Sequence, residues 1–134
     1  MTAYLLDTNV VSELSKREPA PQVVSWLARD PDCALSVLTM GELRRGARLV
    51  HRRDPVRARR LTGWIDALQL DFRERLIPVD EAVAQEWSAL PAGRTLPVID
   101  SLIAATARVH GLTIATRNTR DFSDLGVRLF DPFD

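Results

Sequence analysis

The chain contains a single cysteine, Cys33, and only two histidines, His51 and His110. One cysteine cannot form an internal disulfide, and it cannot supply the thiolate cluster of a structural zinc site. Two histidines are too few for a metal centre built on several imidazoles. Any metal bound by this chain must therefore rely on oxygen ligands.

Long apolar segments are also missing. No run approaches the ~18 residues of a membrane span, and no basic segment leads into an apolar signal core. The 134 residues, of which 46% are hydrophobic and 27% charged, fit one globular domain over 1–134. We expect a cytoplasmic protein with no membrane partner.

Lysine is nearly absent, and the 18 basic and 18 acidic residues leave no net charge. The charges are unevenly spread, because the segment 44–60 sets its arginines against the single acid Asp54. The arginines of this segment, called here the 44–60 patch, are Arg44, Arg45, Arg48, Arg52, Arg53, Arg57, Arg59 and Arg60. A neutral total thus conceals a strongly positive region.

Short apolar runs alternate with segments of helical periodicity along the chain. The patterns predict strands at 3–6, 33–35, 76–79, 112–115 and 127–130. Helices are expected after the first strand and at 22–29, 37–51, from 55 onward, 81–90 and 98–109, with a loop at 91–94. The helices at 37–51 and from 55 are expected to form an antiparallel pair. This alternation predicts an α/β fold with a mainly parallel sheet flanked by helices.

Asp7 directly follows the first predicted strand. In open α/β sheets, ligands bind in the crevice outside the carboxyl ends of the strands, where Asp7 is expected to lie. Two interpretations are open for this acid: it caps the helix that follows, or it is the first ligand of a metal site. On Asp7 alone the cap is favoured.

Three further acids occupy comparable places. Glu42 lies on a partly apolar helix face, and Asp100 lies in the first turn of a helix that is apolar nearly all round and is expected to be buried. Asp121 follows a later strand, in a polar segment that begins at Thr116. Because parallel strands open on one edge of the sheet, these acids can converge there with Asp7.

Convergence of the four acids would select a cation. Two like charges about 4 Å apart repel by roughly 4 kcal/mol at an effective dielectric near 20. Carboxylates without thiolate or imidazole favour Mg²⁺ or Mn²⁺ over zinc or copper. Such a metal, with positions left for water, suits hydrolysis of phosphate esters, because it lowers the pKa of an attacking water.

Four ordered motifs across the chain resemble those of PIN-domain proteins, and most of all the VapC and FitB-like toxins of type II toxin–antitoxin pairs. The motifs are LLDTNVVSE from Leu5, SVLTMGEL from Ser36, PVIDSLIAATA from Pro97, and ATRN from Ala115 through Asp121-Phe122. The resemblance implies the three-layer PIN-like fold.

The same resemblance implies a function. It points to an endoribonuclease dependent on Mg²⁺ or Mn²⁺, usually a homodimer, that a small cognate antitoxin holds inactive. The resemblance also allows a larger toxin–antitoxin hetero-oligomer. The family's acidic site carries over to Asp7, Glu42, Asp100 and Asp121, of which Asp121 is the least constant. Asn9 and Thr116 match supporting polar positions. Cleavage of RNA would leave 5′-phosphate and 3′-hydroxyl ends.

Two alternatives stay open. The chain is either another divalent-metal phosphohydrolase or an RNA-binding or regulatory partner without nuclease activity, in which the acids are structural. A haloacid-dehalogenase-type phosphatase is disfavoured because it requires a second Asp where Asn9 stands. The 44–60 patch is a solvated face, an RNA contact or an antitoxin-docking surface.

Overall fold

The structure is a computed structural model that describes residues 3–91 and 95–134. Within these ranges five strands form one sheet in the order β3-β2-β1-β4-β5, and every neighbouring pair is parallel. The strands are β1 (Ala3–Leu6), β2 (Asp32–Ser36), β3 (Leu76–Ile77), β4 (Thr113–Ala115) and β5 (Leu129–Phe130). The predicted α/β fold with a parallel sheet is confirmed.

Helices connect the strands, and local sequence sets their ends. They are α1 (Thr8–Glu13), α2 (Pro21–Leu27), α3 (Val37–His51), α4 (Pro55–Asp71), α5 (Glu81–Ser88), α6 (Val98–His110) and α7 (Thr119–Phe122), with a short 3₁₀ helix η1 (Arg73–Arg75). The side chains of Asp54 and Asp80 cap α4 and α5 by accepting backbone N–H bonds. Gly111 ends α6 in the left-handed conformation, with φ of 65°.

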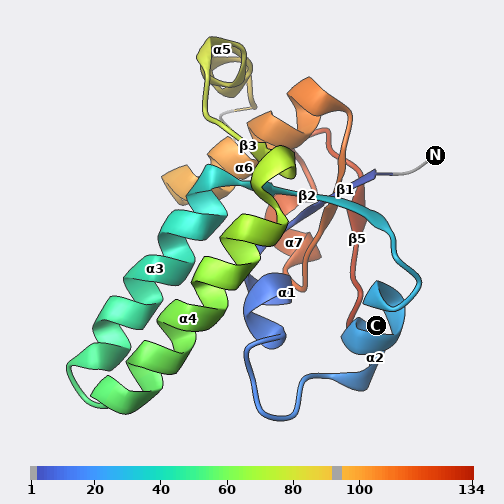
Figure 1. Cartoon of the computed structure of the whole chain (residues 1–134). Helices are drawn as coiled ribbons and strands as arrows, with labels where there is room; N and C mark the ends of the chain where they lie inside the picture. Colours follow the sequence, from blue (N-terminus) through green and yellow to red (C-terminus); the bar gives the residue numbers. More distant parts are fainter. Residues whose placement is uncertain (1–2, 92–94) are drawn as a thin grey trace.

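Two apolar cores lie on the two faces of the sheet. Successive side chains of a strand point to opposite faces, so Leu5 joins one core and Leu6 the other. The core with Leu6 packs against α1, α2, α3 and α4, whereas the core with Leu5 packs against α6 and α7. This produces three layers of helix, sheet and helix (Figure 1).

Strand order reverses beside β1. From β1 the chain adds β2 and β3 on one side, and then crosses to add β4 and β5 on the other. Leu6 pairs with Ala115, and the N–H of Asp7 donates to the Ala115 carbonyl at 2.9 Å. The polar residues that follow these two strands therefore begin at the same point on the sheet edge, where α/β proteins bind ligands.

The helices α3 and α4 form an antiparallel hairpin that extends beyond the sheet (Figure 1). This is the predicted pair, and the 44–60 patch occupies much of it. Where α4 returns to the sheet, Arg75 of η1 holds the chain to β2 by donating to the carbonyl of Cys33 at 3.1 Å. Along the described chain, none of the helices is long and apolar enough to cross a membrane.

Several predictions of detail were wrong. Residues 119–122, expected as a loop, form α7, and the last strand is shorter than predicted. The helix α6 is not buried all round, because Val98 is 61% exposed and Asp100 is only partly buried. Trp87 has the helical spacing of a packed residue, but it is 43% exposed and donates its Nε1–H to Ser101 Oγ at 2.8 Å. Most of the predicted loop at 91–94 lies outside the described residues.

The fully buried Leu5 provides a test of this packing. We expect Leu5→Ala to lower the free energy of unfolding by about 2–5 kcal/mol, because it opens a cavity between β1 and α6. Leu70→Ala, at a position that is 65% exposed, should change it by less than about 0.5 kcal/mol. Urea denaturation measures both, and equal losses in the two variants would contradict the assigned core.

Candidate active site

Asp7 lies at the junction of β1 and α1 and is 6% exposed. Its Oδ1 accepts the backbone N–H of Thr8 at 2.9 Å, so that it caps α1. Its Oδ2 accepts the hydroxyl of Thr116 at 2.8 Å. Burial raises the pKa of Asp7, these hydrogen bonds oppose the rise, and the charge of Asp121 adds to it. The capping interpretation is therefore confirmed, although it accounts for only one oxygen of the carboxylate.

Asn9 and Thr116 join the two central strand ends. The side-chain amide of Asn9 donates to Thr116 Oγ1 at 3.2 Å and to Asp7 Oδ2 at 3.4 Å, and its Oδ1 accepts the N–H of Arg117 at 3.1 Å. Thr116 Oγ1 also accepts the N–H of Asn118 at 3.0 Å. The two predicted supporting residues thus orient Asp7 and fix the segment that follows β4.

Glu42 comes from the second turn of α3, where Ser36 caps the helix start. Its Oε1 accepts the hydroxyl of Thr8 at 2.5 Å. The sequence analysis did not predict this contact of Thr8. Its position beside Asp7 was the available signal, since a residue at the start of α1 faces the same strand edge.

Asp100 lies in the first turn of α6, on the opposite side of the sheet from α3. Its pKa is raised to about 6, first by burial and then by the charges of Asp7, Glu42 and Asp121. These charges act on Asp100 only because all four carboxylates approach one region. The electrostatics therefore support proximity of the four acids, which as a common metal site stays a prediction.

Asp121 lies on α7 and is exposed. It influences the pKa of both Asp7 and Asp100, which places it at the rim of the same site. Within residues 3–91 and 95–134, however, no three Asp, Glu, His or Cys side chains form a ready-made metal shell. Their carboxylate oxygens are nonetheless the donors that Mg²⁺ prefers, and this ion usually completes its shell with water.

The fold and these side chains define an α/β protein with an acidic site at the point where strand order reverses. Residues 4–127 match the PIN domain family model. The chain is 38% identical to toxin FitB of Neisseria gonorrhoeae, covering 96% of this chain and 97% of that one. It is 34% identical to a VapC ribonuclease of Sinorhizobium fredii, covering 97% of each.

Solved structures agree with these similarities. The crystal structure of FitAcB from Neisseria gonorrhoeae matches with a TM-score of 0.88 and 34% identity, over 97% of this chain and 98% of that chain. FitAB bound to a DNA fragment matches with a TM-score of 0.87 and 34% identity, over 98% and 96%. The chain belongs to the PIN-domain family, and the resemblance to VapC and FitB-like toxins is confirmed.

Burial of Asp100, together with the charges of Asp7, Glu42 and Asp121, generates a stability prediction for the protein in EDTA. Because its pKa is raised from 3.8 to about 6, the group stabilises the fold fully below pH 3.8, and this contribution is lost as pH rises through 6. We expect Asp100→Asn to raise the free energy of unfolding by about 1 kcal/mol at pH 7, after allowance for solvent screening.

The gain should disappear near pH 4, where the wild-type carboxyl is also neutral. Urea denaturation at both pH values measures it, with Asp32→Asn as an exposed control expected to change little. If the free energy of unfolding of Asp100→Asn at pH 7 were equal to or lower than that of the wild type, the raised pKa of Asp100 would be contradicted.

Proposed function

We propose that this protein is the toxin of a type II toxin–antitoxin pair and acts in the cytoplasm as an endoribonuclease dependent on Mg²⁺ or Mn²⁺. The proposal is supported by two hydrogen bonds at the sheet edge, from Thr8 to Glu42 and from Thr116 to Asp7. It is also supported by the charges of Asp7, Glu42 and Asp121, which add to burial in raising the pKa of Asp100. The printed names of its relatives, which include ribonucleases, support the choice of RNA as substrate.

Each acid has a separate part in this proposal. Asp7, Glu42 and Asp100 would hold the cation, and Asp121 at the rim would assist them or orient water. When bound, the cation supplies Lewis acidity toward water and neutralises charge on the phosphodiester. Thr8 fixes one oxygen of Glu42, while Thr116 and Asn9 fix one oxygen of Asp7. These hydrogen bonds orient the carboxylates before the substrate binds. Less ordering is then needed to reach the transition state.

We also propose that a cognate antitoxin binds this chain and that the toxin forms a homodimer, within a larger hetero-oligomer when the antitoxin is present. Several structural neighbours are toxin–antitoxin complexes, and some of those complexes are bound to DNA. These titles describe the neighbours, and they support the proposal through likeness of fold and sequence.

The nuclease proposal predicts cleavage of structured RNA by the purified chain with Mn²⁺ or Mg²⁺ and none with EDTA. We expect Asp100→Asn to abolish cleavage while keeping the fold, because it removes a charged ligand without changing side-chain volume. Asp32→Asn is the matched control. Gel analysis of RNA and circular dichroism measure the two properties. RNA binding without divalent-dependent cleavage would instead support a regulatory partner.

The partner proposal predicts that the small reading frame adjacent to this gene encodes a protein that copurifies with the chain. Coexpression should yield a complex larger than the toxin alone by light scattering, and the complex should not cleave RNA. A neighbouring product that neither binds nor inhibits the active chain would contradict this assignment.

A further inference from the structure

A cationic cleft lies apart from the acidic site, between the end of α1 and the first half of α4. It has a volume of about 400 Å³. Lys16 and Arg17 line it from the segment after α1, and Arg57 and Arg60 line it from α4. Leu61 and Trp64 provide apolar surface within the same hollow. Figure 1 shows α1 beside α4.

The cations of this cleft are poorly balanced by the protein. Among the described residues, no acidic side chain makes an ion pair with Arg17, Arg57 or Arg60, and Lys16 contacts Glu13 Oε1 at 2.9 Å. The backbone N–H groups at the start of α4 add positive potential, of which one is capped by Asp54. Cations held around a common hollow repel one another, so an anion bound there would be stabilised.

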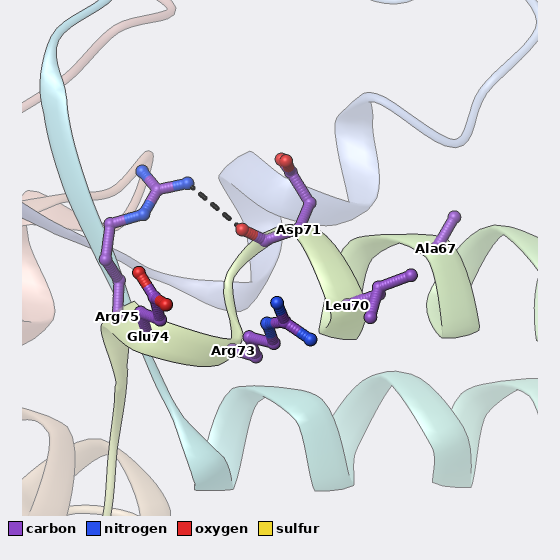
Figure 2. A pocket seen from close by; sticks show the side chains of 6 residues that line it. All are labelled: Ala67, Leu70, Asp71, Arg73, Glu74 and Arg75. Carbon is purple, nitrogen blue, oxygen red and sulfur yellow. Dashed lines mark hydrogen bonds between the residues drawn. The ribbon is translucent and has the colours of Figure 1, made fainter.

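Some of the other basic side chains are used within the fold. Arg44 pairs with Asp66 at 3.0 Å, and Arg108 with Glu86 at 3.7 Å. In the hollow at the end of α4, Figure 2 shows Arg73 and Arg75 together with Asp71 and Glu74, and Arg75 donates to the Asp71 carbonyl. That hollow contains both signs of charge, whereas the cleft between α1 and α4 is lined by cations alone among its charged residues.

The distance between the cleft and the acidic site matches a few nucleotides of a polynucleotide strand. Asp7 caps α1 at the acidic site, and the cleft begins with residues at the other end of this helix. Seven residues at about 1.5 Å each separate Asp7 from Leu14, a span of roughly 10 Å. A stacked polynucleotide strand rises about 3.4 Å per nucleotide along its axis, so the span corresponds to about three stacked nucleotides.

We propose that this cleft binds the phosphodiester backbone of the RNA substrate about three nucleotides from the cleavage point. The proposal rests on the nuclease function proposed above and assigns substrate positioning to Arg57 and Arg60, supported by Lys16 and Arg17. Guanidinium groups suit this task because their donors match phosphate oxygens in pairs. Contacts to phosphate would fix register along the strand without reading its bases.

Fluorescence anisotropy with a labelled single-stranded RNA of about 20 nucleotides tests the cleft separately from catalysis. The background is the full chain with Asp100→Asn in EDTA, which cannot cleave. We expect the double variant R57Q/R60Q to weaken RNA binding about tenfold at low salt, and to reduce the slope of log K against log salt by about 1. The matched double variant R29Q/R73Q removes the same charge from exposed arginines and should change affinity less than twofold.

Cleavage of the same RNA by the chain with an intact acidic site supplies a second readout. R57Q/R60Q should raise KM about tenfold and leave kcat within twofold, because the acids are untouched. Unchanged affinity and salt slope in R57Q/R60Q would overturn the proposal. If that variant instead lost affinity for a hexaglutamate peptide, the cleft would belong to an acidic protein segment. Absence of cleavage by the wild type with Mn²⁺ would reject the nuclease function. The anisotropy experiment would still show whether the cleft binds RNA.

Discussion

The buried charge of Asp7 at the end of the central strand is the constraint on which the rest of the site depends. A carboxylate with 6% exposure requires hydrogen-bond donors, and Thr8 and Thr116 provide them from α1 and from the end of β4. The parallel pairing of β1 with β4 makes this possible, because it brings residues 109 positions apart into contact. The pairing of β1 with β4 therefore also sets the orientation of the Asp7 carboxylate.

The remaining acids come from helices that pack on opposite faces of the sheet. Glu42 belongs to α3, whose apolar side joins one core, whereas Asp100 belongs to α6, whose apolar side joins the other. Packing of both layers therefore forces like charges toward one edge and raises the pKa of Asp100 to about 6. Concentrating negative charge at this edge lowers the stability of the folded protein. Functional sites commonly have this cost.

Much of this could be predicted from sequence. The hydrophobic patterns predicted the first strand and α3. The positions of the four acids relative to the predicted strands and helices predicted a common site. Local signals failed where tertiary contacts decide the outcome: α7 is a single turn anchored by the buried Phe122, and its polar sequence indicated a loop. The contact between Thr8 and Glu42 spans 34 positions, so no local pattern reveals it. Similarly, Trp87 has the spacing of an apolar helix face, but the residue is 43% exposed in the folded chain.

The fold places hydrogen-bond donors around Asp7, acids around Asp100 and cations beyond the end of α1. In the proposed function, the acids would hold a divalent ion and the cations would bind the RNA backbone. The central claim is that the carboxylates share one cation. Anomalous diffraction from a crystal soaked in Mn²⁺ tests it most directly. The account predicts a peak among Asp7, Glu42 and Asp100, absent after Asp100→Asn. A well-ordered crystal in which Mn²⁺ binds elsewhere and leaves these carboxylates without a cation would contradict it.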